Sequence, residues 1–310
     1  MSGMLRIVFM GTPDFAIPTF QMLIDQYEVV LAVTKPDKPK GRGGAIAMPP
    51  VKELALKHNI PVYQPENAKT PEFYETLKAA NADLFVTCAY GKILTAEVLT
   101  LPKYGCINVH ASILPAYRGA APLWHAVIDG QAESGITTMM TDVGMDTGDI
   151  LRIDRTPIPE DMTMGELHDA LSELGPKTLK ATLDALEAGT LTRTPQAHEL
   201  ATYAPMVERE SGHIDWTKPA RQIHNLVRGT NPFPAAYTNT VTGARVKIWK
   251  TRVLQESGNH GTPGTVTLGK GQAFVACGEG LLELLEVQGE NARKMTIGEY
   301  LNGHTLDQFK

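Results

Sequence analysis

A chain of 310 residues has room for two domains, since one domain usually takes about 100–200 residues. Its 43% hydrophobic and 20% charged residues place it among soluble globular proteins, and a net charge of −5 argues against a general nucleic-acid coat. The three cysteines lie far apart and form no Cys-x-x-Cys pair, which argues against a disulfide framework and a zinc site and favours a reducing compartment.

The N-terminal apolar run at 5–10 is shorter than the core of a signal peptide, and Gly-Thr-Pro follows it. No later stretch approaches the length of about 18 apolar residues that a membrane helix needs. We therefore expect no membrane segment and a cytoplasmic location.

The first half of the chain alternates predicted strands and helices. Strands are predicted at 5–10, 29–34, 60–62, 84–89, 106–110, 136–140 and 150–158. Helices are predicted up to residue 26 and at 51–58, 71–80, 120–129 and 163–187, the last interrupted at Gly175 and Pro176. This alternation is typical of a parallel sheet with right-handed crossovers. Because Gly-x-Gly-x-x-Gly is absent after the first strand, the pattern does not predict a dinucleotide site.

Two connections in this half are candidates for ligand contacts. The connection at 35–50 is predicted to be a loop and contains four cations, three glycines and four prolines. Its cations either meet phosphate or are simply solvated. The turn after the strand at 84–89 contains Tyr90 and Gly91, where glycine either permits a close backbone approach to a ligand or only closes a turn.

The stretch at 106–119 is the strongest candidate for a site. Asn108, His110 and Ser112 alternate along a predicted strand and therefore share one face. Pro115 ends the strand, so these polar groups lie at its carboxyl end, where open α/β sheets place their chemistry. The alternative is that they only satisfy backbone groups at a strand end.

These residue types favour transfer of an acyl group over covalent catalysis. The chain has no Gly-x-Ser-x-Gly elbow and no Walker loop. Asn108 can donate to an oxyanion, and His110 can relay the proton of an attacking amine. Asp142 or Asp146 can orient the imidazole. The aspartates at 142, 146 and 149 lack the spacing of an EF-hand, so we expect no metal.

The pattern of predicted elements changes near residue 207. We predict a first domain at 1–189, a linker at 190–206 and a second domain at 207–310, where short strands with glycine turns indicate a small barrel. Arg245 and Lys247 share one face of a strand, whereas Lys250 and Arg252 have the other parity, which a bulge or strong twist would correct. Such a basic face fits nucleic acid or, equally, solvated edge charges.

Several motifs in this order resemble the methionyl-tRNA formyltransferases. They are Phe9-Met10-Gly11-Thr12-Pro13-Asp14-Phe15, Ala89-Tyr90-Gly91, Asn108-Val109-His110, Ser112-Ile113-Leu114-Pro115-Ala116-Tyr117-Arg118-Gly119, Gly119-Ala120-Ala121-Pro122 and Asp142-Val143-Gly144-Met145-Asp146-Thr147-Gly148-Asp149. Ile113 stands where leucine is usual. The resemblance spans nearly the whole chain.

The resemblance implies a Rossmann-like N-terminal formyltransferase domain and a smaller OB-like β-barrel that contacts tRNA. It implies that Asn108, His110 and Asp146 are catalytic. The residues implied to lie against the folate are Ser112, Ile113, Leu114 and Pro115, with Tyr90 and Gly91 lining the same pocket. Arg42 matches an arginine that enters the acceptor stem of tRNA, although Gly43 and Gly44 follow it where relatives can have a lysine pair.

The implied reaction moves a formyl group from 10-formyltetrahydrofolate to the α-amino group of methionine on initiator Met-tRNA, for translation initiation, and leaves tetrahydrofolate. We expect a monomer that needs no metal. An amino-sugar N-formyltransferase and a formyltetrahydrofolate hydrolase are rivals with the same chemistry, and Arg42 with the basic barrel favours tRNA over both. A noncatalytic RNA-binding protein is a rival of another class, which has no use for Asn108, His110 and Asp146 together.

Overall fold

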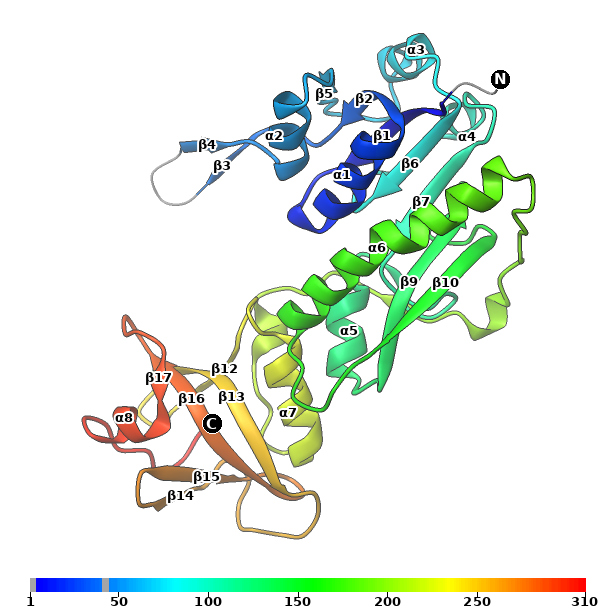
Figure 1. Cartoon of the computed structure of the whole chain (residues 1–310). Coiled ribbons are helices and arrows are strands. Elements are labelled where there is room, and N and C mark those ends of the chain that lie inside the picture. The colour runs from blue at the N-terminus through cyan, green and yellow to red at the C-terminus, as the bar shows by residue number, and fades with distance from the viewer. Residues whose placement is uncertain (1–3, 41–44) are drawn as a thin grey trace. The chain divides into compact units, whose positions relative to one another are not determined.

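The computed structural model describes residues 4–40 and 45–310, and the chain divides into two compact units (Figure 1). The first unit comprises Met1–Pro122, Ser134–Thr156 and His168–Ala204. The second comprises Leu123–Glu133, Pro157–Leu167 and Pro205–Lys310. Most of the segment 190–206 therefore belongs to the first unit. Within the described ranges, no helix combines the length and apolar composition needed to cross a membrane.

A seven-stranded sheet in the order β10-β9-β7-β6-β1-β2-β5 forms the centre of the first unit. Its strands are β1 (Arg6–Gly11), β2 (Glu28–Val33), β5 (Val62–Tyr63), β6 (Leu84–Cys88), β7 (Cys106–His110), β9 (Glu133–Met140) and β10 (Ile150–Pro157). The five strands from β7 to β5 run parallel, which confirms the predicted Rossmann-like sheet. β9 pairs antiparallel with β7 and extends the sheet at one edge, a common addition to parallel sheets.

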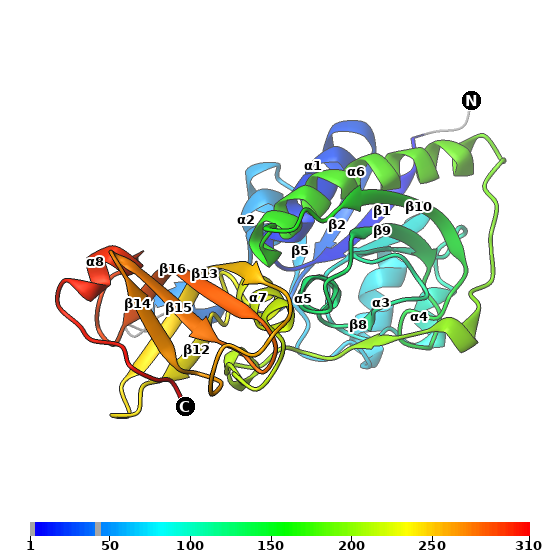
Figure 2. The same ribbon diagram turned by 90° about the horizontal axis from the view of Figure 1, so that it is seen from below.

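Helices cover both faces of this sheet. Figure 2 shows α1 (Ile17–Gln26), α2 (Pro50–Lys57) and α6 (Met164–Glu187) on one face, and α3 (Pro71–Ala79) and α4 (Ala96–Leu99) on the other. The sequence sets where they begin: α1 and α2 have proline in the first turn, and the Thr70 hydroxyl caps α3 by accepting from the Phe73 N–H. Phe9 of β1 and Phe20 of α1 stack at 4.5 Å between ring centroids and fix helix against sheet.

The interruption predicted within the last of these helices is wrong. α6 continues through Pro176 as one helix of 24 residues. Leu171 lies before the proline and Leu179 and Leu183 after it, and all three are fully buried. Burial of this continuous apolar face outweighs the one backbone hydrogen bond that proline removes.

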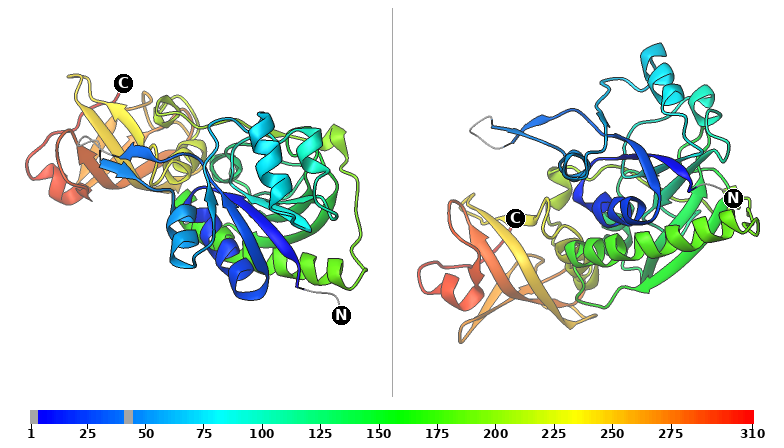
Figure 3. Two further views of the ribbon diagram at one scale, coloured as in Figure 1. Left: turned by 90° about the horizontal axis from the view of Figure 1, so that it is seen from above. Right: turned by 45° about the horizontal axis from the view of Figure 1, so that its top comes forward.

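The connection predicted as a loop at 35–50 contains a short hairpin instead. β3 (Lys38–Lys40) and β4 (Ala45–Ala47) pair antiparallel and project from the end of β2 (Figure 3). Residues 41–44 between them, including Arg42, lie outside the described residues. A second small pairing joins β8 (Arg118–Gly119) to β11 (Tyr203–Ala204) in parallel. β11 comes from the segment that the sequence predicts to be a linker.

The second unit contains an antiparallel sheet in the order β12-β13-β16-β15-β14. Its strands are β12 (Ala236–Asn239), β13 (Arg245–Gln255), β14 (Val266–Gly269), β15 (Gln272–Ala276) and β16 (Leu281–Gly289), with β17 (Met295–Thr296) paired to β16. The C-terminal segment forms bridges to both open edges, from Phe309 to Thr240 and from Gln308 to Thr265. These bridges close the sheet, which confirms the predicted barrel. α5 (Pro122–Ile128), α7 (Ala220–Gly229) and α8 (Ile297–Leu301) complete the α-helices that the structure describes.

The parity change predicted within one barrel strand is also present. β13 has register shifts against β16 between Ile248 and Lys250 and again before Thr251. Val246 and Ile248 are buried before the shift and Thr251 after it, so the inward face changes parity. The charged side chains of β13 consequently share the outer face along its length.

Candidate active site

The topology of the parallel strands locates the site. From β1 the chain builds outward through β2 to β5 and then returns to β6 on the other side of β1. Ligands of open α/β sheets bind outside the carboxyl ends of the strands near such a switch point. The neighbouring strands β1, β6 and β7 end there at Gly11, Cys88 and His110. Polar side chains at this edge are therefore candidates for chemistry.

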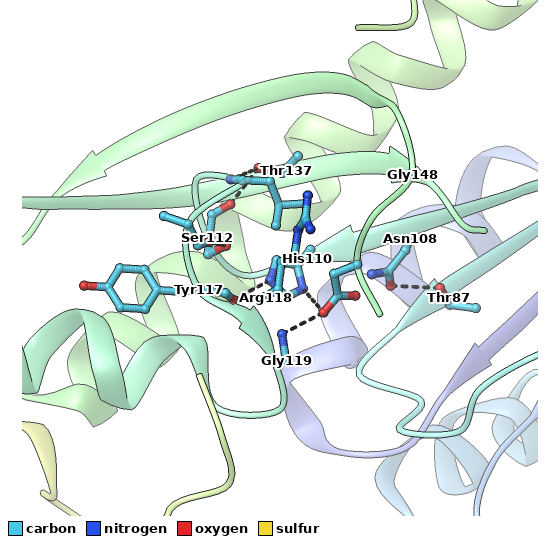
Figure 4. Close-up of polar contacts among 12 residues, drawn as sticks. Thr87, Asn108, His110, Ser112, Tyr117, Arg118, Gly119, Thr137 and Gly148 are labelled. Carbon is cyan, nitrogen blue, oxygen red and sulfur yellow. Dashed lines mark hydrogen bonds and ion pairs between the residues drawn. The ribbon is translucent and has the colours of Figure 1, made fainter. Parts of the chain in front are cut away.

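Asn108 is oriented by a residue of the neighbouring strand. Asn108 on β7 pairs in register with Thr87 on β6, and the Thr87 hydroxyl donates to Asn108 Oδ1 at 2.8 Å (Figure 4). Since the side-chain oxygen is occupied, the amide NH2 is the group available to a ligand, and it makes no hydrogen bond to any residue that the structure describes. Asn108 thus presents a donor. Thr87 carries no sequence signal of its own role.

His110 ends β7 with a defined tautomer. Its Nε2 lies 3.0 Å from the carbonyl oxygen of Tyr117, and because a carbonyl only accepts, Nε2 carries the hydrogen. In the neutral ring, Nδ1 is then the basic nitrogen. It lies 3.7 Å from Asp146 Oδ2 (Figure 4). A proton taken up at Nδ1 would gain a carboxylate partner at once.

The structure brings Asp146, and not Asp142, to the imidazole. Asp146 Oδ2 also accepts from the backbone N–H of Gly119 at 2.8 Å, which fixes that oxygen. Asp142 Oδ1 instead accepts from the Gly144 N–H at 2.9 Å and from the Thr147 hydroxyl at 2.5 Å, and so shapes its own loop. The two aspartates of the motif therefore have different tasks.

The segment after β7 is held by β9. Thr137 donates its hydroxyl to the Ser112 carbonyl at 2.6 Å and accepts from the Leu114 N–H at 3.2 Å. The Ser112 hydroxyl donates to the Ala116 carbonyl at 2.6 Å, so it serves the loop and is not a free nucleophile. Ser112 and Leu114 are buried, whereas Ile113, like Pro115, is half-buried.

The turn after β6 exposes its glycine and buries its tyrosine. The Tyr90 ring packs in the apolar core, and burial raises the pKa of its hydroxyl, which has no partner among the described residues. Gly91 is exposed with φ +69°, and a Cβ there would lie 2.5 Å from Lys35 Nζ. Any contact of Gly91 with a ligand is thus a backbone contact. Burial, with a smaller effect of Lys38, lowers the pKa of Lys35.

Backbone strain gathers at the same edge of the sheet. Ala89, Tyr117 and Asp146 have φ values of 49°, 60° and 52° although none is glycine. Such conformations cost about 1–3 kcal/mol each and persist where surrounding contacts fix them, often at functional sites. Here Ala89 follows β6, Tyr117 lies in the segment after β7, and Asp146 carries the carboxylate that faces His110.

Neither cysteine chemistry nor a clustered metal site has support in the described ranges. All three cysteines are free and buried, and burial raises the pKa of each thiol to about 12, so the thiolate nucleophile is not available. No group of three or more His, Cys, Asp and Glu side chains is arranged to hold a metal ion in residues 4–40 and 45–310.

Comparison with known proteins identifies the family. The model of the formyl transferase family matches residues 5–183, and that of the formyl transferase C-terminal domain matches 206–305. The chain is 55% identical over 306 residues to the methionyl-tRNA formyltransferase of Acetivibrio thermocellus and 50% identical to that of Caldanaerobacter subterraneus subsp. tengcongensis, with 98% of each chain covered in both cases.

A solved structure supports the fold. The crystal structure of a sugar 3N-formyl transferase, obtained in the presence of dTDP and 5-N-formyl-THF, superposes with a TM-score of 0.68 at 19% identity. The match covers 94% of this chain and 100% of the other. With two family models in the expected order and relatives matched over nearly their full length, the chain belongs to the methionyl-tRNA formyltransferase family.

Proposed function

We propose that this chain transfers the formyl group of 10-formyltetrahydrofolate to the α-amino group of methionine on initiator Met-tRNA. The observation that carries the proposal is one arrangement at the carboxyl edge of the sheet. A free amide donor on Asn108 stands beside a basic nitrogen on His110, which in turn faces the fixed carboxylate of Asp146. A donor and a base side by side suit attack of an amine on a carbonyl.

Asn108 acts on the oxygen of the formyl group. When bound, 10-formyltetrahydrofolate supplies the carbonyl carbon that is attacked and the nitrogen that leaves. Negative charge then develops on the carbonyl oxygen, and the Asn108 NH2 is placed to donate to it. One preorganised donor of this kind lowers a barrier by about 3–4 kcal/mol. The hydrogen bond from Thr87 keeps the amide in this orientation.

His110 handles the proton of the attacking amine. The α-amino group must be neutral to attack, and its usual pKa of about 7.7–8.0 leaves an appreciable neutral fraction at pH 7. As the new C–N bond forms, the amine proton passes to His110 Nδ1, and Asp146 stabilises the imidazolium. The same proton is then delivered to the folate nitrogen as the old C–N bond breaks, so the histidine ends neutral.

The folate fits the residues that surround this edge. We assign its contacts to the half-buried Ile113 and Pro115 and to the backbone of Gly91, which lacks a side chain. Ile93 and Met145 are 58% and 55% exposed, and such large apolar side chains at one edge suit a flat ring system. Ser112, Leu114 and Tyr90 shape the wall of the site from within.

The tRNA contacts belong to cationic segments of both units. Lys35 and Lys38 belong to the connection after β2, where Asp37 is already neutralised by Lys52 at 2.7 Å. Their charge is thus available to phosphate, and we assign the same role to Arg42. In the second unit, the exposed cations of β13 offer a further surface for the polyanion.

We also propose that the chain works as a monomer in the cytoplasm. Charged initiator tRNA is used there, and three reduced, buried cysteines suit that compartment. The proposed catalytic residues Asn108, His110 and Asp146 lie together within one chain, so a second copy is not needed to complete this set. Light scattering at enzyme concentrations used for assay should give the mass of one chain, with and without tRNA bound.

The decisive experiment offers one donor to three acceptors. Purified chain is mixed with labelled 10-formyltetrahydrofolate and, in parallel, with initiator Met-tRNA, an amino-sugar nucleotide, or water alone. We expect label on the methionyl amino group, with the other two rates lower by several powers of ten. Faster formylation of the sugar or faster release of formate would replace the proposal by one of those activities, and no transfer to any acceptor would leave RNA binding.

A further inference from the structure

The carboxylate that faces His110 lies on a largely exposed segment, whose own side-chain hydrogen bonds are those of Asp142. The four residues before Asp146, at 142–145, are exposed, and Asp146 itself is in the left-handed region with φ 52°. A side chain on such a segment keeps its place only if the backbone is held from elsewhere. The catalytic geometry therefore depends on whatever fixes the backbone around Asp146.

Gln196 provides that support. Its Nε2 donates to the carbonyl oxygen of Asp146 at 2.9 Å and to that of Gly148 at 2.7 Å, so both amide hydrogens clamp the same turn. Gln196 is 5% exposed. It lies 50 positions along the chain from Asp146, in a segment whose sequence predicts only a linker.

Arg118 fixes the orientation of the clamp. Gln196 Oε1 accepts from Arg118 Nε at 3.1 Å and from its Nη2 at 2.6 Å. Because a guanidinium only donates, the side-chain oxygen of Gln196 must face Arg118 and the NH2 must face Asp146. Arg118 is 2% exposed, and its Nη2 also lies 3.0 Å from Nδ1 of His198.

The backbone on either side of Arg118 touches both members of the catalytic pair. Tyr117 accepts from His110 Nε2 at 3.0 Å, and Gly119 donates to Asp146 Oδ2 at 2.8 Å (Figure 4). Three consecutive residues therefore hold the pair: Tyr117 contacts Nε2 of the imidazole and Gly119 contacts the carboxylate. Arg118, through Gln196, holds the backbone of Asp146. A change in this network moves Asp146 relative to His110.

We propose that Gln196 is a positioning residue for the formyl transfer. It sets the Asp146 carboxylate against Nδ1 of His110, and Arg118 holds its amide in the orientation that does so. This inference rests on the proposed function, since it acts through the proposed pair of His110 and Asp146. It predicts that the rate of the chemical step depends on Gln196 although no reacting atom touches it.

The isosteric change Gln196→Glu separates the two sides of the clamp. A glutamate still accepts from Arg118, so the buried guanidinium keeps a partner, but it loses both hydrogens toward the carbonyls of Asp146 and Gly148. We expect kcat for initiator Met-tRNA to fall about 10- to 100-fold, as small misplacements of catalytic groups do. The KM values for folate and for tRNA should stay within about twofold, since neither substrate contact is changed.

Gln288→Glu is the matched control. Gln288 is a partly buried amide that likewise accepts from one side chain, at 3.0 Å from Trp249 Nε1, and donates to a carbonyl, at 2.8 Å from Ala292. It belongs to the second unit. Because Gln288 pairs in register with Lys247 on the face proposed to meet tRNA, its variant is compared at saturating tRNA, where it should keep the wild-type kcat. Gln196→Met, which is neutral and similar in length, serves as a second variant if the glutamate prevents folding, and the thermal midpoint of each variant is measured alongside.

A double variant with Asp146→Asn tests the route of the effect. If Gln196 acts through Asp146, the Gln196→Glu change costs little in the Asp146→Asn background, because the carboxylate it positions is already gone. Losses that multiply in the double variant, or a Gln196→Glu enzyme as fast as Gln288→Glu, would overturn the inference. Wild-type turnover of Asp146→Asn alone would instead remove the proposed catalytic role on which the inference rests.

Discussion

Two histidines, one in each unit, are almost equally buried and yet differ in what they can do. His110 is 6% exposed and His224 is 4% exposed. Each has a ring nitrogen 3.7 Å from a carboxylate oxygen, that of Asp146 for His110 and that of Asp161 for His224. By residue types and distances alone, both look like a base with its orienting acid.

The surroundings of His224 make it a structural residue. Its Nδ1 lies 3.0 Å from the Thr251 hydroxyl and its Nε2 lies 3.4 Å from the Glu160 carbonyl, so both nitrogens have other partners. The side chain of Asp161 is 77% exposed. Burial, together with the positive charge of Arg228, lowers the pKa of His224 and favours the neutral ring.

His110 differs in three respects that together suit the proposed catalytic role. Its Nδ1 has no other partner in the described part of the chain, its carboxylate is fixed by the Gly119 N–H, and the free NH2 of Asn108 lies on the same strand. A buried histidine beside a carboxylate is therefore not enough. A free nitrogen, a fixed acid and a neighbouring donor distinguish the site from the core.

The largest effect that tests this contrast is loss of His110. His110→Ala should lower kcat/KM for formyl transfer by about 100- to 10,000-fold, the usual range for a positioned general base. His224→Gln, which keeps a hydrogen-bonding side chain, should leave kcat/KM near the wild-type value. Circular dichroism and thermal midpoints of both variants report the fold, with the exposed His58→Ala as the control for substitution in the first unit. Near-normal turnover of His110→Ala would remove the contrast.

A smaller effect should follow when the donor loses its orientation. Thr87→Val keeps the shape of the buried side chain but removes the hydrogen bond to Asn108 Oδ1. The amide can then turn its oxygen toward the substrate, so we expect kcat to fall about tenfold, equivalent to the roughly 1.4 kcal/mol of one hydrogen bond.

Thr138→Val is the control for this change. Thr138 is a fully buried threonine of the same sheet, and its hydroxyl lies 2.7 Å from that of Thr182 on α6, away from the proposed catalytic residues. Its variant should lose stability without a specific loss of kcat. Equal kcat in the two variants would mean that Thr87 supports the fold and not the orientation of Asn108.

The sequence predicts those parts of the site that lie within one segment. Asn108 and His110 share a strand, and their alternation together with Pro115 places them on one face at its end. The alternation of apolar runs likewise predicts the parallel sheet and the barrel. The same local pattern left Asp142 and Asp146 as alternatives, because only tertiary structure shows which carboxylate reaches the imidazole.

The remaining parts of the site depend on contacts between distant segments. Thr87 reaches Asn108 through the register of β6 against β7, which no spacing in the sequence encodes. Gln196 returns to the Asp146 turn from a polar segment without periodicity. Pro176 leads to a wrong prediction of a break in α6 because the sequence shows only the local helix breaker. Burial of the α6 face, a tertiary effect, overrides it.

A third, smaller effect concerns the outer face of the barrel. The Arg245 guanidinium lies 4.3 Å from the Tyr237 ring and the Lys247 ammonium 5.8 Å from the Trp249 ring, so the rings hold cations outward. If this face meets tRNA, Arg245→Ala with Lys247→Ala should raise KM for tRNA a few-fold and weaken its salt dependence, without a change in KM for folate. The exposed Lys270→Ala, in the turn between β14 and β15, is the control. No change would mean that these charges are only solvated.

The smallest expected effect returns to His224 and appears in stability. The folded-state pKa of His224 is lowered, so the unfolded chain binds the proton more tightly. The contribution of His224 to the free energy of unfolding of the second unit should therefore be complete above the unfolded pKa of about 6.5. It should be lost as pH falls from there through the folded pKa. All three tryptophans, at 124, 216 and 249, belong to the second unit, so their fluorescence follows its unfolding.

Substitution isolates the contribution of this one histidine. His224→Gln should flatten the decrease below about pH 6.5 relative to the wild type, because glutamine does not titrate in that range. The exposed His304→Gln, in the same unit, should leave the profile unchanged. If His224→Gln kept the full decrease, the acid sensitivity would arise from carboxylates such as Glu160, whose pKa is lowered by its hydrogen bond to Arg221, and the difference between the two buried histidines would then rest on catalysis alone.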